Sequence, residues 1–170
     1  MLKNINRVKI NILFVLLIIS CFVILSSCAQ ESEININLKD LADVIAAKID
    51  LSNTDEYSAE QIRTFYGIKP DDVVQIIVLK ELNVNSAEVL ILAEAVDKDK
   101  AKEIENKLKV SKTNKLNELL DYSANPDNKR QYYIVEGADI VVNGQYVFWA
   151  VYPQNKDIMD IINNYIKDSK

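Results

Sequence analysis

Hydrophobic residues form one continuous run near the start of the chain and a series of shorter, periodic segments after it. The run from Ile12 to Leu25 has only one clearly polar residue, Ser20. Beyond residue 36, apolar positions recur either at the 3.6-residue spacing of a helix or in the short β-branched runs that are typical of strands. The pattern therefore predicts an N-terminal segment of the export-signal or anchor type, followed by a folded domain.

Helical end signals agree with the 3.6-residue periodicity in several segments. Asn37 can cap the first helix, and Gly67, which readily adopts the left-handed conformation, can end the second. Asn125-Pro126 places a cap before a proline at the first helical position. The predicted helices cover residues 38–49, 58–66, 97–122 and 155–167. A further helix of about two turns is favoured between the Asn125 cap and Gly137, although Gln131 to Val135 also has strand propensity.

Strands are predicted in two pairs, each forming an antiparallel hairpin. The turn of the second pair is Asn143-Gly144, which favours a type I′ turn with positive φ at both central residues. This turn places Val141 opposite Tyr146, and Asp139 opposite Phe148. The predicted strands cover residues 73–79, 87–96, 139–142 and 145–152.

The order of these elements predicts an α+β domain rather than an alternating α/β fold. Along the chain the order is ααββααββα, with a four-stranded, mainly antiparallel sheet built from the two hairpins and packed with helices. The polar stretch from Ser52 to Glu60 is assigned no strand. Residues 37–170 are therefore expected to form a single α+β domain.

The residues around the apolar run have the order of a bacterial export signal. Three basic residues and no acidic residue precede it. After it, Leu25-Ser26-Ser27-Cys28 resembles the lipobox of bacterial lipoproteins, in which the cysteine is lipidated on sulfur and becomes the mature N-terminus. The resemblance implies cleavage between Ser27 and Cys28. It makes residues 1–27 the signal peptide and residues 28–36 a lipidated cysteine with a short tether.

The same segment is also compatible with an uncleaved transmembrane anchor, or with a signal that is cut without lipidation. A helix needs about 20 apolar residues to span the hydrocarbon of a bilayer, and this run is shorter. A diacylglycerol on Cys28 supplies two acyl chains, and two membrane signals are what stable anchoring requires. We therefore expect a lipid-anchored protein on the extracytoplasmic face of the cell membrane.

Composition limits the chemistry that is open to the domain. Removal of residues 1–27 leaves 17 basic and 25 acidic residues, a formal charge of −8, which argues against nucleic acid as a partner. The chain has no histidine, and its two cysteines, Cys21 and Cys28, would be lost to cleavage and to lipid. No metal site, cofactor or cysteine nucleophile is therefore expected.

Three short motifs lie at turns and strand starts of the predicted domain. They are Tyr66-Gly67-Ile68-Lys69-Pro70-Asp71-Asp72-Val73, Asn85-Ser86-Ala87-Glu88-Val89 and Asn143-Gly144-Gln145-Tyr146-Val147. With the element order, they resemble an uncharacterised lipoprotein family of Gram-positive bacteria, whose domain has no known function. The resemblance covers roughly residues 38–168. It implies an exported, anchored domain and supplies no activity or catalytic residues.

The second hairpin offers a candidate binding surface. Period-two alternation puts Tyr146, Phe148 and Tyr152 on one face of the sheet and Trp149 on the other. Tyrosines can keep a hydroxyl in water beside an apolar ring, so these residues form a candidate surface for a protein segment or a glycan. The alternatives are that helices cover this face too, or that it is a half-exposed sheet face without a partner.

Acidic clusters give no support for a metal site. Asp71-Asp72 and Asp97-Lys98-Asp99 lack the ligand spacing of a calcium loop, and position twelve counted from Asp97 is Leu108 instead of a glutamate. The two clusters are better explained as charges at the start of a strand and of a helix.

Together these features predict a membrane-anchored lipoprotein with a non-catalytic domain that binds a cell-envelope protein or a glycan. The main alternative is a carboxylate-dependent enzyme of the cell envelope that acts on glycan, using Asp139 or Glu88 near tyrosines. That enzyme would require two carboxylates converging in a pocket. A solute-capturing transporter subunit would need two lobes, and the length of the chain suits one.

Overall fold

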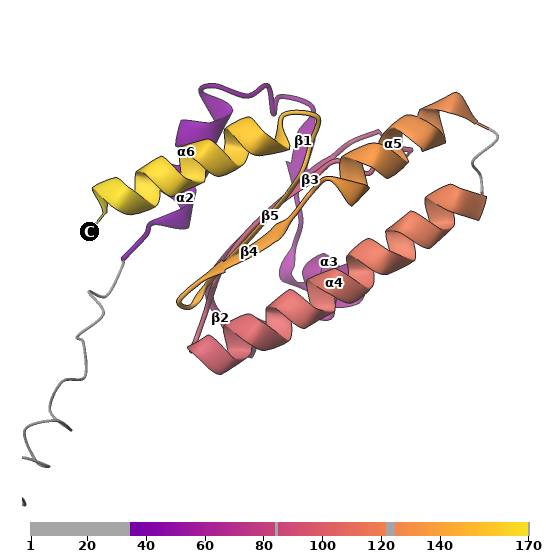
Figure 1. Cartoon of the computed structure of the whole chain (residues 1–170). Helices are drawn as coiled ribbons and strands as arrows, with labels where there is room; N and C mark the ends of the chain where they lie inside the picture. Colours follow the sequence, from indigo (N-terminus) through magenta and orange to yellow (C-terminus); the bar gives the residue numbers. More distant parts are fainter. Residues whose placement is uncertain (1–34, 84, 122–124, 170) are drawn as a thin grey trace, which may run out of the picture. The chain divides into compact units, whose positions relative to one another are not determined.

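The computed structural model describes residues 35–83, 85–121 and 125–169, which form an α+β domain (Figure 1). The signal segment, Ser27, Cys28 and the tether up to residue 34 lie outside the described residues. The helices are α2 (Leu38–Ala46), α3 (Ala59–Tyr66), the 3₁₀ turn η1 (Pro70–Asp72), α4 (Lys98–Asp121), α5 (Pro126–Glu136) and α6 (Asn155–Asp168). The strands are β1 (Thr54–Glu56), β2 (Val73–Glu81), β3 (Val89–Ala95), β4 (Ile140–Asn143) and β5 (Tyr146–Val151).

The sheet has five antiparallel strands in the order β1-β2-β3-β5-β4. The α+β class and the antiparallel pairing agree with prediction, whereas the four-stranded sheet and the order ααββααββα are wrong. The missing strand is β1, where Thr54 lies opposite Glu81 and Glu56 opposite Leu79. Its residues are polar because it is an edge strand with exposed side chains, so no apolar period reveals it.

The second hairpin has a different register from the predicted one. Val141 lies opposite Phe148, and Asn143 lies opposite Tyr146. Gly144 has φ +63°, and no described non-glycine residue has a positive φ. The central residues are therefore Gly144 and Gln145, as in a type II′ turn with glycine first. Because the register shifts by an even number of residues, each side chain keeps its predicted face.

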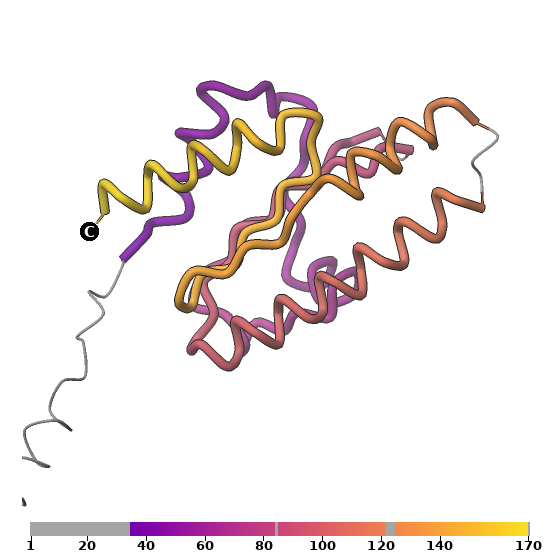
Figure 2. Tube along the Cα trace, in the orientation of Figure 1, coloured from indigo at the N-terminus to yellow at the C-terminus, as the bar shows by residue number. Residues whose placement is uncertain are grey.

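Helices cover both faces of the sheet. On the face that we call the α4 face, α3, α4 and α5 pack on apolar strand residues that include Ile91, Val147 and Trp149. On the opposite α6 face, α2 and α6 pack on Leu92 and Phe148. Figure 2 shows α2 and α6, from opposite ends of the domain, side by side on this face. The central strand β3 is consequently buried at every residue.

Local end signals explain why the helices begin and end where they do. The Asn37 side chain accepts hydrogen bonds from the backbone N–H groups of the first turn of α2. Ser58 and Gln61 form a capping box at α3, which ends at Gly67 with φ +68°. The Asn125 side chain accepts from Asp127 N at 2.9 Å and caps α5.

Polar groups are paired at the end of the sheet where β2 begins and β3 ends, which we call the Asp72 end. The buried Asp72 carboxylate receives Lys107 Nζ at 3.0 Å and Lys100 Nζ at 3.2 Å, both from α4. The hydrogen bond from Lys107, with support from Lys100 and Lys69, lowers the pKa of Asp72 to about 2. Asp72, one of the clustered acids in the sequence, is thus an ion-pair partner that ties α4 to the start of β2.

The same end holds the first described residues of the chain. Ile36 N donates to the Tyr146 hydroxyl at 3.0 Å, and Ile36 O accepts from Gln75 Nε2 at 2.8 Å. The buried Glu94 carboxylate accepts from the side-chain amides of Gln75 and Gln145. Each of these buried polar groups therefore has a partner, and the chain is fixed to the sheet at residue 36.

Candidate functional site

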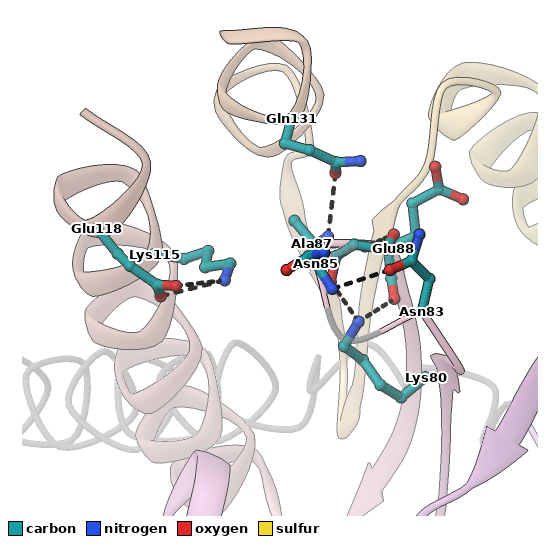
Figure 3. Close-up of polar contacts among 9 residues, drawn as sticks. Lys80, Asn83, Asn85, Ala87, Glu88, Lys115, Glu118 and Gln131 are labelled. Atoms are coloured by element: carbon teal, nitrogen blue, oxygen red, sulfur yellow. Dashed lines mark hydrogen bonds and ion pairs between the residues drawn. The ribbon is translucent and has the colours of Figure 1, made fainter. Parts of the chain in front are cut away.

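A polar pocket lies at the opposite end of the sheet, where the β2–β3 loop, the last turns of α4 and the first turns of α5 converge (Figure 3). We call it the amide-rich pocket, and its volume is about 560 Å³. Side-chain amides and two pairs of opposite charges dominate its lining. The lining residues are Asn83, Asn85, Lys115, Glu118, Leu119, Asn125, Asp127, Asn128, Arg130 and Gln131.

Lys80 fixes the β2–β3 loop that forms one wall of the pocket. Its ammonium group donates to Glu88 O at 3.2 Å, as Figure 3 shows, and to Ser86 O at 2.6 Å. From the other side, Gln131 of α5 accepts a hydrogen bond from Ala87 N at 3.0 Å. The loop is therefore held both by the strand beneath it and by the helix opposite, and the pocket wall is preorganised.

Several amides of the pocket have hydrogen-bonding groups to spare. Asn83 Oδ1 accepts from Asn85 N, Asn125 Oδ1 caps α5, and Gln131 Oε1 holds the loop. Within the described residues, none of the side-chain nitrogens of these four amides donates a hydrogen bond. Each NH₂ group offers two donors, so the pocket can bind a ligand that is rich in hydrogen-bond acceptors.

Charges around the pocket balance one another. Lys115 and Glu118 form an ion pair at 3.0 Å on the surface of α4, and Arg130 and Asp127 both come from α5. Burial, with the charge of Lys115, lowers the pKa of Lys80 beneath the loop. An arrangement with equal numbers of cations and anions favours neither a strongly anionic nor a strongly cationic ligand.

A second recess lies on the other side of α5, and Arg130 lines both. Its volume is about 730 Å³, and its lining includes Tyr133, Ile134, Tyr152 and Pro153. Tyr133 is 58% exposed. An exposed aromatic ring next to an amide-rich pocket can supply a stacking surface for a ligand that extends past α5.

Next to the pocket, the carboxylates of Glu88 and Glu81 lie near the buried Tyr152. Burial raises the pKa of Glu88, and the charge of Glu81 raises it further. Burial also raises the pKa of Tyr152, whose hydroxyl has no hydrogen-bond partner among the described residues. Here the charged forms of the side chains are disfavoured, in contrast to Asp72 at the other end of the sheet.

Comparison with known proteins identifies the family of this chain. The family described as domain of unknown function DUF4358 matches residues 47–152. The chain belongs to the DUF4358 family. No curated protein and no solved structure gives a significant match. The match confirms the resemblance to a domain family of unknown function.

The DUF4358 match covers the whole sheet, the helices of the α4 face and every residue that lines the amide-rich pocket. Helices α2 and α6 both lie outside the matched residues. They nevertheless bury the α6 face of the sheet, so a chain cut to residues 47–152 would expose it.

The DUF4358 domain buries the three aromatic residues that were candidates for an exposed binding surface. Tyr146 is 2% exposed, Phe148 is 0% exposed and Tyr152 is 3% exposed, because α2 and α6 cover this face. The rings of Tyr146 and Phe148 stack with centroids 6.2 Å apart. These residues belong to the core, as in the alternative in which helices cover both faces. Tyr152 alone also lines a recess.

The two carboxylates considered for an enzyme are not brought together. Asp139 precedes β4 and Glu88 precedes β3, and β5 lies between these strands. Two strand spacings separate them by at least about 9 Å. Neither residue lines the amide-rich pocket or the recess behind α5. Among the described residues, no group of three acidic, histidine or cysteine side chains is arranged to hold a metal ion.

Sequence reasoning missed the pocket residues of the DUF4358 domain. The sequence marks Asn125 only as a helix cap, and Asn83 and Asn85 only as part of a polar loop between strands. The sequence feature that these residues share is a side-chain amide in one of two segments, the 82–88 loop or the start of α5. The fold brings these two segments side by side. Separately, no helix in the described ranges is both long and apolar enough to span a bilayer.

Proposed function

We propose that the chain is an extracytoplasmic lipoprotein, anchored through a lipid on Cys28, whose domain is a non-catalytic module that binds a neutral glycan of the cell envelope. The amide-rich pocket is the observation that supports this function. Side-chain amides that offer unused N–H donors complement the hydroxyl, acetamido and ring oxygens of a saccharide. The balanced charges around the pocket suit an uncharged ligand.

The recess behind α5 supports a ligand longer than one sugar. Tyr133 offers an exposed ring there, and sugar rings present apolar faces that stack on aromatic side chains. A saccharide chain that passes around Arg130 would contact the amides on one side of α5 and the tyrosine on the other.

Binding of cell-wall saccharides by the full-length protein in detergent tests the ligand. The probes are disaccharides and tetrasaccharides of N-acetylated amino sugars released from peptidoglycan, and calorimetry measures the dissociation constant. Asn85→Ala should weaken binding about five-fold, the effect of losing a hydrogen bond worth about 1 kcal/mol. Its side chain makes no hydrogen bond within the described residues, so the domain should remain folded.

Asn114→Ala is the matched control, because Asn114 is an exposed asparagine of α4 that does not line the pocket. It should bind like the parent protein. If no saccharide binds, or if Asn85→Ala and Asn114→Ala bind equally well, the glycan function fails. Crosslinking in cells that captures a protein at position 85 would then assign the pocket to a protein partner.

Mass spectrometry of the protein purified from its own membranes tests the anchor. A mature N-terminus at Cys28 carrying a diacylglycerol is the expected result. An intact leader, or an unmodified sulfur on Cys28, would overturn the lipoprotein assignment without affecting the binding test.

A further inference from the structure

Strand β4 is an unprotected edge of the sheet. It is the last strand in the order β1-β2-β3-β5-β4 and pairs regularly with β5 through all four of its residues (Figure 1). Its sequence, Ile140-Val141-Val142-Asn143, contains no charged residue and no proline, and its pairing has no bulge, so three common means of blocking an edge strand are absent from it. Val142 is 38% exposed. The strand is therefore a template for the addition of another strand.

The hairpin geometry shows which backbone groups face outward. Asn143 and Tyr146 close a two-residue turn, so they are a hydrogen-bonded pair, and such pairs alternate along the ladder. Val141 is then bonded to β5, whereas Ile140 and Val142 direct their N–H and C=O groups away from the sheet. Outside the β4–β5 ladder, these two residues make no backbone hydrogen bond within the described ranges.

The opposite edge of the sheet is protected. Strand β1 has three residues, and Asp55 and Glu56 are both exposed. Two β1 strands pairing with each other would bring four carboxylates together, which costs free energy in an already acidic protein. Only the β4 edge is thus suited to pairing with a copy of itself.

We propose that two copies of this chain associate through antiparallel pairing of their β4 strands about a two-fold axis at Val141. In this register Ile140 of each copy exchanges backbone hydrogen bonds with Val142 of the other. Val141 lies opposite the same residue of the second copy, and Asp139 lies opposite Asn143, whose amide can donate to it. No like charges face each other, and the same surface serves both copies, as a closed dimer requires.

This inference does not depend on the glycan function, since β4 contributes no residue to the amide-rich pocket. The two-fold register makes Val141 a non-hydrogen-bonded pair, in which the Cα atoms lie about 4.5 Å apart. That separation lies within the range over which a disulfide can form.

Cysteine crosslinking of the full-length protein in membranes tests the pairing. Val141→Cys should give a covalent dimer under mild oxidation, at least about ten-fold more than Asp55→Cys on the β1 edge, because pairing raises the local thiol concentration. The parent protein, run alongside, shows any dimer formed through Cys21 or Cys28. If Val141→Cys forms no more dimer than Asp55→Cys, the pairing is ruled out.

Val142→Lys provides a second test, because a charged side chain at an exposed edge position blocks strand addition. Sedimentation of the purified protein in detergent should show that the parent is a dimer. The dimerisation affinity of the variant should be at least about ten-fold lower, or roughly 1.4 kcal/mol. The melting curve of the variant should retain its cooperative transition. The proposal would be overturned if the parent protein sediments as a monomer. It would also be overturned if β4 pairs only with a strand of a different protein and not with a second copy of this chain.

Discussion

The two ends of the sheet treat their polar groups in opposite ways. At the Asp72 end, the Asp72 carboxylate forms ion pairs with two lysines, and the Tyr146 hydroxyl accepts a hydrogen bond from the backbone N–H of Ile36. At the pocket end, burial raises the pKa of Glu88 and lowers the pKa of Lys80, and the Tyr152 hydroxyl has no partner among the described residues.

The difference lies in what each end contributes to the free energy of unfolding at neutral pH. A carboxylate whose pKa is lowered in the folded state stabilises the fold at neutral pH, whereas one whose pKa is raised by burial reduces stability there. Groups with disfavoured charges and spare hydrogen-bonding capacity cluster at functional sites. The Asp72 end thus stabilises the fold at neutral pH, whereas the buried charge at the pocket end opposes it.

The largest effect is expected from Asp72→Asn. The substitution removes the charge that receives Lys107 and Lys100, and it should lower the free energy of unfolding at pH 7 by about 2 kcal/mol. Urea unfolding followed by circular dichroism measures the loss. Asp71→Asn is the matched control, because Asp71 is exposed, and it should change stability by less than about 0.5 kcal/mol. Equal effects of the two substitutions would show that the ion pairs of Asp72 do not stabilise the fold.

Acid should produce the same loss in the parent protein. The folded pKa of Asp72, about 2, lies below its ordinary value of 3.8, so the stabilisation is present above that ordinary value and is lost as the pH falls towards 2. The stability difference between the parent and Asp72→Asn should therefore shrink between pH 4 and pH 2. A difference that stays constant over this range would show that the charge is not the cause.

Tyr146→Phe tests the hydrogen bond between Ile36 and Tyr146 at the Asp72 end. It leaves the buried Ile36 N–H without an acceptor and should cost about 1 kcal/mol in the free energy of unfolding. Hydrogen exchange should also show faster exchange of the Ile36 amide. Unchanged exchange at residue 36 would contradict the proposed attachment of the chain.

At the pocket end, Glu88→Gln should have the opposite sign. Because burial disfavours the charged carboxylate, a neutral amide should raise stability at pH 7 by up to about 0.5 kcal/mol. The gain should disappear below the ordinary glutamate pKa of 4.5, where the parent side chain is protonated in the folded and unfolded states alike. Destabilisation at pH 7 would mean that the attraction of Arg130 outweighs burial.

The smallest effect is expected from Tyr152→Phe, the counterpart of Tyr146→Phe. Removing a buried hydroxyl without a partner leaves no group unsatisfied, so stability should stay within about 0.5 kcal/mol of the parent or rise slightly. The same unfolding experiment compares the two tyrosines directly. A loss above about 1 kcal/mol would reveal a hydrogen bond from this hydroxyl.

Elements with their own end signals could be predicted from the sequence. Asn37, Ser58 and Gly67 act on the backbone within one turn, so their effect does not depend on the rest of the fold. Strand β1 has no such signal, because its polar residues form a strand only where β2 offers an edge for pairing.

The candidate site depended on tertiary contacts that the sequence does not display. Period-two alternation correctly placed Tyr146 and Trp149 on opposite faces, but whether α2 and α6 cover one of those faces is decided by long-range packing. Likewise Asn85 and Gln131 look ordinary in their own segments. They form a pocket only because α5 packs against the β2–β3 loop.

The hydrogen bonds of Ile36 fix the start of the described chain at the end of the sheet opposite the pocket. The described chain begins at the Asp72 end, and the nine residues of β2 span about 30 Å between that end and the pocket end. In Figure 1 the described chain begins at the left, and the facing ends of α4 and α5 lie at the right. The amides of the pocket therefore lie a full strand length along the sheet from the residue that joins the domain to the preceding chain, and a ligand bound there would not contact residue 36.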